Sequence, residues 1–308
     1  MKRILLLILF SILVLFLFDR LGAFLMKSIT ADSHGQKVYY LANETKDDII
    51  LIGNSRSNNN YVSSILRDTL GKSVYNAGIN GSGIVSHYLA LNVILKHHRP
   101  KLVVLEINEA SFYKSWLYYP KISLYTPFIG ENKEVDSVFN SINELWKYKL
   151  FHLLKYNGHA TTNILYFISG KDFDTDYGYT KIPSKSVDVS KLSYDDDLVE
   201  LDTIKIEYFK KFIAKCRANK VPLVLTTAPV YKENFLLPYQ KLKELVTEFD
   251  LTIFDYSTSE IFVGKSEYFN DLTHMVDEGA RKFTSIFSHD LKLYLDTIQT
   301  SSCFLVGD

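Results

Sequence analysis

Short apolar runs alternate with longer helical segments along most of this chain, and this alternation limits the folds that it can adopt. The runs that have the continuous apolar character of buried strands are 48–52, 73–76, 101–107, 221–227 and 252–256. The segments with helical spacing are 61–70, 84–98, 201–219, 238–249 and 276–298. Strands that alternate with helices of about ten residues or more are typical of a parallel sheet covered by helices on both faces. We therefore predict an α/β fold around a five-stranded parallel sheet.

Residues 108–200 interrupt the alternation. This stretch is rich in aromatic side chains and contains one clear helical segment, near 135–156. A structureless loop of such length is uncommon inside a compact domain. We expect 108–200 to form an inserted, largely helical cap on a domain that spans 47–298, followed by a polar tail at 299–308.

The N-terminus is strongly apolar. Two basic residues precede a run at 4–18 in which Ser11 is the one polar residue. Extending the segment to Met26 gives enough length to cross a hydrocarbon core of about 30 Å. We predict that 1–26 is a transmembrane helix and that 27–46 is a polar connector with a short helix.

Two other interpretations of this segment remain open. A cleavable signal peptide has the same basic start and apolar middle, but Asp19 and Arg20 stand where a small-x-small cleavage site would be expected. A buried helix of a soluble protein fits poorly with so apolar a terminus. With an uncleaved anchor, the positive-inside rule keeps Lys2 and Arg3 in the cytoplasm and places the rest of the chain outside.

Charge and cysteine content exclude several classes of protein. The chain has 35 Lys and Arg against 35 Asp and Glu, a balance that argues against a general nucleic-acid binder. Two cysteines, Cys216 and Cys303, are too few for a disulfide scaffold or a cysteine-rich metal module. Neither HExxH nor CxxC occurs in the sequence. We expect no metal ion and no other cofactor.

Polar sequences follow three of the predicted strands. Residues 53–57 follow the first strand, the glycine-rich segment 76–83 follows the second, and 106–108 ends the third. Asp271 and His274 lie near the C-terminus. Each feature alone is most often a turn or a cap. Together they are expected at one edge of the sheet, because sites form beyond the carboxyl ends of parallel strands.

Ser55, His274 and Asp271 form a chemically coherent set. A serine is a weak nucleophile until a neighbouring base takes its proton, and histidine does so near neutral pH. A carboxylate three residues before the histidine can hold the imidazole tautomer and stabilise the imidazolium. These residues are the candidates for nucleophile, base and orienting carboxylate.

In this order, the polar blocks resemble those of the SGNH (GDSL-type) hydrolase family. The resemblance implies a flavodoxin-like three-layer sandwich over about 48–108 and 201–298. It also implies that Ser55, in Gly53-Asn54-Ser55, is the nucleophile and that Asp271 and His274 are the Asp-x-x-His pair.

The resemblance further implies an oxyanion hole. Its candidate donors are the N–H of Gly81, with Gly78 and Gly83 as other registers, and the side chain of Asn108. A glycine lets the backbone approach the oxyanion without a Cβ in the way. The chain has Glu-Ile-Asn-Glu at 106–109, where the family commonly has Gly-x-Asn-Asp. Capping of the following segment is therefore the alternative role for Asn108.

The function implied is that of an extracytoplasmic serine esterase at a bacterial inner membrane, with its catalytic domain in the periplasm or cell exterior. Ser55 would be acylated by an ester, for example an O-acetyl group of an envelope polysaccharide. An O-acyltransferase with the same triad and a non-catalytic glycan-binding or accessory protein are the alternatives. The expected partners are an acylated carbohydrate or other ester substrate and the membrane, and no nucleic acid.

Overall fold

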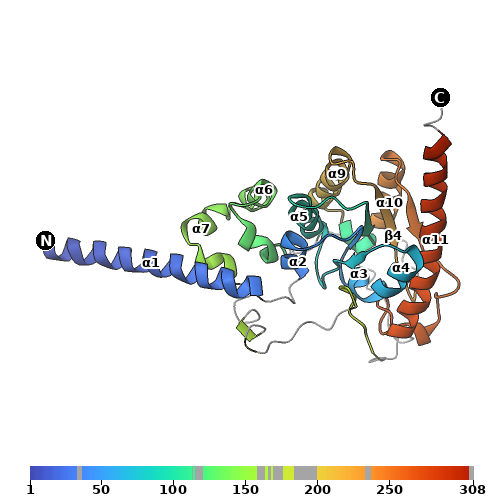
Figure 1. The fold of residues 1–308 in the computed structure, drawn as a ribbon, viewed down its shortest axis with the longest axis horizontal. Helices are drawn as coiled ribbons and strands as arrows, with labels where there is room; N and C mark the ends of the chain where they lie inside the picture. Colours follow the sequence, from blue (N-terminus) through green and yellow to red (C-terminus); the bar gives the residue numbers. More distant parts are fainter. Residues whose placement is uncertain are drawn as a thin grey trace. The chain divides into compact units, whose positions relative to one another are not determined.

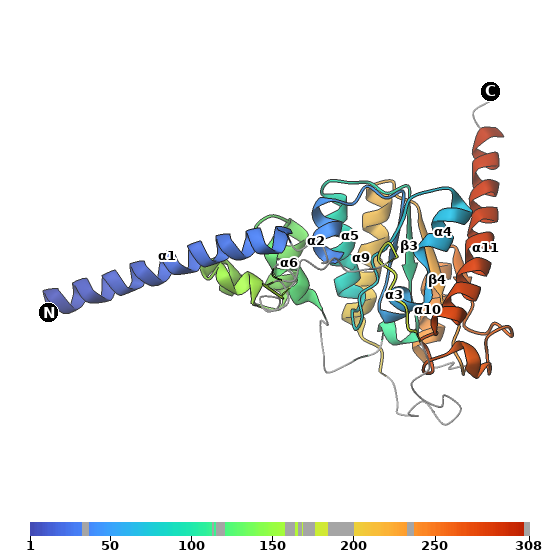
Figure 2. The same ribbon diagram turned by 60° about the horizontal axis from the view of Figure 1, so that its bottom comes forward.

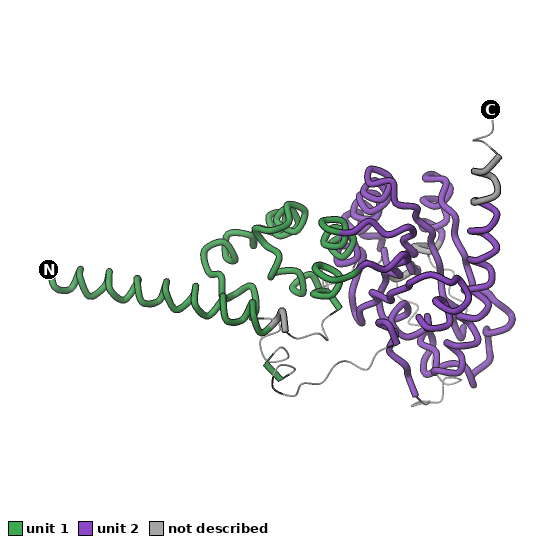
Figure 3. Tube along the Cα trace, in the orientation of Figure 1, with its two compact units in different colours: residues 1–45, 89–97, 121–174 green, residues 46–88, 98–120, 175–308 purple. Residues whose placement is uncertain are grey.

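The computed structural model of the chain consists of two compact units (Figure 1, Figure 2). It describes residues 1–32, 37–112, 114, 121–157, 164, 165, 168, 176–183, 200–232 and 237–304. The helical unit contains residues 1–45, 89–97 and 121–174, and the sheet unit contains 46–88, 98–120 and 175–308 (Figure 3). The expected cap at 108–200 includes stretches outside the described residues. Its extent and the expected domain boundaries stay predictions.

Five parallel strands form the centre of the sheet unit. They are β1 Ile49–Ile52, β2 Val74–Asn76, β3 Leu102–Glu106, β4 Leu223–Thr227 and β5 Ile253–Asp255. Each strand lies inside one of the predicted apolar runs, and their order in the sheet is β2-β1-β3-β4-β5. This is the flavodoxin-like strand order. The predicted α/β fold with a five-stranded parallel sheet is confirmed.

β1 lies in the interior of the sheet, and this position decides where the following residues emerge. Ile50 is opposite Tyr75 of β2 on one side and Val103 of β3 on the other. All four residues of β1 are buried. The chain therefore leaves the carboxyl end of β1 between two other strand ends, where loops can converge on it.

Helices cover both faces of the sheet (Figure 2). They are α3 Ser55–Asn60, α4 Ser63–Leu70, α5 Ile84–Leu95, α9 Thr203–Ala218, α10 Leu237–Glu248 and α11 Asp277–Phe304. α11 packs against α3 and α4 on one face. On the other face, Tyr88 from α5 packs edge-to-face against Tyr208 of α9, with ring centroids 5.5 Å apart. The sheet is thus the middle of three layers.

An aromatic cluster fills the space between α11 and the sheet. Phe283 of α11 is fully buried. Four rings surround it with centroid distances between 5.0 and 6.2 Å, and they belong to Tyr61, Tyr256, Phe262 and Phe287. Aromatic pairs in edge-to-face geometry add to the hydrophobic energy of the core. This cluster fixes α11 against the strands that carry the candidate site.

The helical unit begins with the long apolar helix α1 (Lys2–Asp32). Its part from Lys2 to Ile29 is long and apolar enough to cross a membrane, and an 18-residue stretch of it has a mean hydropathy of 2.6 with none of its residues buried. A single-pass anchor and a signal sequence both have these properties. The helix continues past Met26 into the expected connector, because no glycine or proline interrupts 27–32. α2 (Lys37–Asn43) follows in the same connector.

The segment predicted as one helix near 135–156 is instead broken into three short elements. They are α6 Lys133–Ser141, α7 Leu145–Leu150 and the 3-10 turn η3 Leu153–Tyr156. Asn143 adopts a left-handed conformation with φ of 57°, and the N–H of Glu144 donates to the carbonyl of Phe139. This conformation and this hydrogen bond end α6 and turn the chain.

The helical unit also contains the 3-10 helix η2 (Ile122–Phe128). The last helix, α11, runs to Phe304 and so extends beyond the predicted end at 298.

Removal of the Phe283 ring should strongly destabilise the sheet unit. Phe283→Ala would leave a cavity among four rings, and truncations of this kind cost about 3–5 kcal/mol. The measurement is the free energy of unfolding by urea of the full chain in detergent, with near-ultraviolet circular dichroism as the signal. Ser285→Ala lies on the exposed side of the same helix and should change stability by less than about 0.5 kcal/mol. Equal effects of the two substitutions would contradict the core position of Phe283.

Candidate active site

The candidate nucleophile stands at the start of a short helix. Gly53 and Asn54 follow β1, and Ser55 is the first residue of α3. The side chain of Asn54 caps this helix by accepting a hydrogen bond of 2.8 Å from the N–H of Arg56. A cap of this kind satisfies one of the unpaired N–H groups of a helix terminus. Ser55 is thereby held at the carboxyl edge of the sheet, half-buried.

Asp271 and His274 are joined by a local turn between the 3-10 turn η5 (Ser266–Tyr268) and α11. Oδ1 of Asp271 accepts hydrogen bonds from the N–H groups of Thr273, at 2.9 Å, and His274, at 2.8 Å. Oδ2 of Asp271 lies 2.7 Å from Nδ1 of His274. The spacing of three residues lets one carboxylate fold the turn with one oxygen and hold the imidazole with the other.

The structure brings Ser55, His274 and Asp271 together. Nε2 of His274 lies 2.7 Å from Oγ of Ser55, a residue 219 positions away in the chain. The side chains of His274 and Asp271 are 25% and 37% exposed, so solvent and small molecules reach them. The order serine, imidazole, carboxylate is that of a catalytic triad.

The charge state of Asp271 follows from its contacts. Burial would raise the pKa of this carboxyl, but the hydrogen bond and charge of His274 and the two backbone N–H groups outweigh burial and lower the pKa to about 2. An ionised carboxylate accepts hydrogen bonds only, so Nδ1 of His274 carries a proton. In the neutral imidazole, the lone pair of Nε2 then faces Ser55, whose hydroxyl donates to it.

The expected oxyanion donors lie on loops that follow the two strands beside β1. Gly81, with φ of 70°, is exposed in a turn closed by a bond from the N–H of Ser82 to the carbonyl of Ile79. The N–H of Gly78 donates to Oδ1 of Asn76 at 2.9 Å, which makes Gly78 part of the scaffold. The role of Gly81 at an oxyanion stays a prediction.

Asn108 is buried at the start of the 3-10 turn η1 (Glu109–Phe112). Its N–H donates to Oγ of Ser111 at 3.1 Å, and that hydroxyl donates to Oδ1 of Asn108 at 3.4 Å. The carbonyl of Asn108 also accepts from the N–H of Ser111, at 3.0 Å. These bonds correspond to the capping role that was the alternative for Asn108. Its oxyanion role stays a prediction.

Three consecutive asparagines on α3, Asn58, Asn59 and Asn60, connect the nucleophile helix to three other segments. All three are buried. Nδ2 of Asn58 donates to Oδ1 of Asn80 at 2.8 Å, and Nδ2 of Asn59 donates to the carbonyl of Thr180 at 2.7 Å. These residues are not among those that the sequence motifs indicated. The signal was a run of three amides directly after a nucleophile motif.

Asn60 holds the loop that carries the candidate base. Its Nδ2 donates to the carbonyl of Thr273 at 3.0 Å, and its Oδ1 accepts from the N–H of Met275 at 2.9 Å. These two residues flank His274 in the chain. One side chain on the nucleophile helix therefore holds the backbone on both sides of the candidate base.

Asn76, at the end of β2, holds the other side of α3. Its Nδ2 donates to the carbonyls of Ser57, at 2.8 Å, and Tyr61, at 2.9 Å, and its Oδ1 accepts from Oγ of Ser57 at 3.2 Å. A Cβ added to Gly78 would collide with the backbone N of Asn58. Only glycine lets the loop after β2 approach the nucleophile helix this closely.

A buried ion pair involves Arg56, the residue that follows the candidate nucleophile. Nε of Arg56 is 3.3 Å from Oε1 of Glu106, with the two side chains 4% and 0% exposed. A nitrogen of the Arg56 guanidinium also donates to the carbonyl of Ala228, after β4. Buried charges require such pairing. This contact accounts for Glu106 at the position where the SGNH family commonly has glycine.

His87 links the Gly81 loop to the end of β1. Nε2 of His87 lies 3.0 Å from Oγ of Ser82, and that hydroxyl donates to the carbonyl of Gly53 at 3.1 Å. His87 is buried, and burial lowers its pKa to about 3. The imidazole is therefore neutral at physiological pH and acts here as a hydrogen-bonding spacer.

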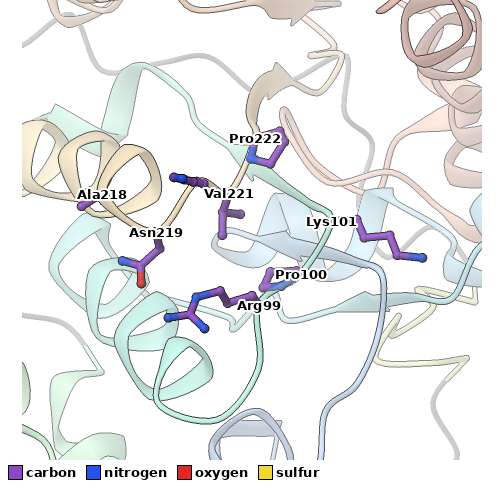
Figure 4. Close-up of a pocket in the computed structure, with 8 residues that line it drawn as sticks. Arg99, Pro100, Lys101, Ala218, Asn219, Val221 and Pro222 are labelled. Atoms are coloured by element: carbon purple, nitrogen blue, oxygen red, sulfur yellow. The ribbon is translucent and has the colours of Figure 1, made fainter. Parts of the chain in front are cut away.

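A hollow of about 670 Å³ lies at the opposite edge of the sheet (Figure 4). Its lining is Arg99, Pro100, Lys101, Ala218, Asn219, Lys220, Val221 and Pro222. These residues precede β3 and β4, whereas Ser55 follows a strand. The hollow is not part of the candidate active site.

No group of three or more His, Cys, Asp or Glu side chains that could hold a metal ion occurs in the described part of the chain.

No protein-family model and no curated protein matches the chain. It is similar to solved structures that are described as GDSL-like lipolytic proteins, the family that the sequence resembles. A lipolytic G-D-S-L family protein from Desulfitobacterium hafniense has 11% identity and a TM-score of 0.41, over 78% of this chain and 97% of that one. A GDSL-like lipase from Bacteroides thetaiotaomicron has 13% identity and a TM-score of 0.34, over 81% and 88% of the two chains.

A third similar structure is that of a gut microbial diltiazem-metabolizing enzyme. It has 13% identity and a TM-score of 0.36, and the match covers 79% of this chain and 46% of that one. Because the identities and TM-scores are low, the proposed function rests on the side chains of this chain and not on these similar structures.

The neutral state of His87 predicts a pH dependence of stability. Between pH 6.5 and about 3, the unfolded chain binds a proton at His87 that the folded chain does not bind. Stability should therefore fall as the pH drops through this window, and His87→Gln should make the fall less steep. The measurement is urea unfolding of the full chain at a series of pH values.

His289→Gln is the control, because His289 is an exposed histidine on α11. This variant should keep the wild-type slope of unfolding free energy against pH. If the unfolding free energy of His87→Gln falls with pH as steeply as that of the wild type in this window, His87 is protonated in the folded chain as it is in the unfolded one.

Proposed function

We propose that this chain is a serine hydrolase of the SGNH type that cleaves ester bonds, with Ser55 as nucleophile, His274 as base and Asp271 as orienting carboxylate. The observation that carries the proposal is the 2.7 Å contact between Oγ of Ser55 and Nε2 of His274. A serine that merely fills a helix terminus needs no imidazole at its hydroxyl. The exposure of His274 leaves room for an ester to approach the same hydroxyl.

In the acylation step, Oγ of Ser55 attacks the carbonyl carbon of the ester while Nε2 of His274 takes the hydroxyl proton. Asp271 stabilises the imidazolium that forms. The tetrahedral intermediate collapses when the bond to the leaving oxygen breaks, and His274 returns its proton to that oxygen. The alcohol leaves, and the acyl group remains on Ser55.

In the second step, a water molecule loses a proton to Nε2 of His274 and attacks the acyl carbon. The bond to Oγ of Ser55 breaks, and the proton returns from His274 to the serine. The products are a carboxylic acid and the free enzyme. An acceptor hydroxyl in place of water would make the same residues an acyltransferase.

Both tetrahedral intermediates carry a negatively charged oxygen that needs fixed donors. Loss of one such donor costs about 3–4 kcal/mol of transition-state stabilisation in mutational precedent. We assign this role to the N–H groups of Ser55 and Gly81, with the side chain of Asn108 as a further candidate. Gly81 is suited to it because its turn is exposed and its loop is tied to Gly53, two residues before the nucleophile.

We assign the reaction to the extracytoplasmic side of a bacterial inner membrane. The support is the apolar helix α1, which begins with Lys2 and Arg3 and offers a whole span of unburied apolar surface. Under the positive-inside rule, the basic end stays in the cytoplasm. The substrate class that this location favours is an acylated carbohydrate of the cell envelope, such as an O-acetylated polysaccharide.

Loss of either Ser55 or His274 should abolish ester turnover. Ser55→Ala removes the attacking oxygen and His274→Ala removes the base. Each variant should lower the turnover of p-nitrophenyl acetate by at least about 100-fold in the full chain in detergent. A fluorophosphonate probe should label the wild type at Ser55 and leave Ser55→Ala unlabelled.

Ser285→Ala and His289→Gln are matched controls on the exposed surface of α11 and should retain wild-type turnover. A folded wild type that neither turns over the ester nor reacts with the probe would refute the proposal. Release of the acyl group to an added sugar in preference to water would identify a transferase.

The carboxylate of Asp271 should matter for turnover rather than for binding. In Asp271→Asn, an amide N–H2 can face Nδ1 of His274 and favour the wrong imidazole tautomer. We expect kcat to fall by roughly 10³–10⁴-fold with little change in KM. Steady-state kinetics with p-nitrophenyl acetate measure both constants, and an unchanged kcat would remove Asp271 from the triad.

A further inference from the structure

The apolar surface of α1 is first interrupted by charged side chains at Asp19 and Arg20. The side chains from Ile4 to Phe18 are exposed, and the first charged residues after them are Asp19 and Arg20. Fifteen helical residues rise about 22 Å. Leu21, Phe24 and Leu25 are also exposed and continue the apolar surface past this pair, so Asp19 and Arg20 lie in the last turns of the span, near the interface away from Lys2 and Arg3.

The segment that contains α7 and η3 is fixed to α1 at this level. Oδ2 and Oδ1 of Asp19 accept hydrogen bonds from the N–H groups of His152 and Leu153, both at 2.9 Å. A guanidinium nitrogen of Arg20 donates to the carbonyl of Leu150 at 3.4 Å. Leu153 also packs closely over Gly22. These contacts lie within the helical unit and join the two segments directly.

Four large apolar side chains of this segment are exposed, and we call them the α7 patch. They are Trp146 at 55%, Leu150 at 55%, Phe151 at 47% and Leu154 at 39%. No residue of α7 is buried. An exposed cluster of this kind marks an interaction surface, and tryptophan is enriched where proteins meet the membrane–water interface.

The charges around the α7 patch are balanced. Nζ of Lys147 lies 2.9 Å from Oε1 of Glu144, and Nζ of Lys149 lies 3.7 Å from Oδ2 of Asp136. An attraction to anionic headgroups is therefore not the main source of binding. The apolar side chains supply it, as they do for helices that lie in the interface plane.

We propose that the α7 patch inserts into the interfacial layer of the same bilayer that α1 enters, on the side away from Lys2 and Arg3. The occupant of the patch is lipid. Its continuity with the lipid-facing surface of α1, through Asp19 and Arg20, favours lipid over a protein partner. The helical unit is then held to the membrane at two places, by the span of α1 and by the α7 patch beside its end.

The test uses the fluorescence of Trp146. The chain has two tryptophans, so the full chain with Trp116→Phe contains one fluorophore. It is reconstituted into phosphatidylcholine vesicles whose acyl chains are brominated either near the headgroup or near their middle. We expect strong quenching by bromine near the headgroup and weaker quenching by bromine in the middle, because interfacial helices lie about 5–10 Å below the headgroup boundary. Addition of anionic lipid should change the quenching little.

Leu150→Glu in the same background should reduce the quenching, because it places a charge in the α7 patch. Leu293→Glu is the matched control, since Leu293 is a similarly exposed leucine, at 53%, on α11 of the sheet unit. It should leave the quenching unchanged. If the protein floats with the vesicles but neither brominated lipid quenches Trp146, the proposal is wrong and the α7 patch faces a protein partner. Protein that does not float with the vesicles would overturn it as well.

Discussion

The candidate site depends on one buried amide, that of Asn60. Its two polar ends bond to the backbone on either side of His274, so the base loop cannot slide along α3 without leaving a buried donor or acceptor unpaired. An unpaired buried polar group costs about 1–3 kcal/mol. This is a large fraction of the net stability of a domain. Asn60 thus fixes the register between the candidate nucleophile and the candidate base, which lie far apart in the chain.

Comparable bonds hold the rest of α3. Asn76 ties the helix backbone to the end of β2, and the pair of Arg56 and Glu106 ties it to β3. These contacts stabilise buried polar groups, because the low dielectric of the interior penalises a group that is left unpaired. A helix of six residues is too short to hold its position by itself. Side-chain bonds to neighbouring strand ends replace the stability that its length does not provide.

Much of this structure was accessible from the sequence. The strands were predictable because continuous apolar runs have a local signature. Ser55 was predictable because it directly follows such a run, and Asp271 and His274 because they are three residues apart and chemically distinctive. Asn58–Asn60 were missed because their partners are distant backbone groups, which leave no periodic trace. The break of the 135–156 segment depends on the left-handed conformation of Asn143. Asparagine adopts this conformation more readily than most residues but also occurs inside helices, so its presence alone does not predict a helix end.

The distance in sequence between Ser55 and His274 has a consequence for synthesis. A ribosome has to add more than two hundred residues after the serine before the imidazole that contacts it exists. The bonds from Asn60 to the base loop form only then. A growing polypeptide therefore emerges with an inert serine hydroxyl, and any acyl chemistry of the finished protein waits for completion of the chain. Truncated products that end before Asp271 lack both the imidazole and the carboxylate, so their Ser55 hydroxyl has no base beside it.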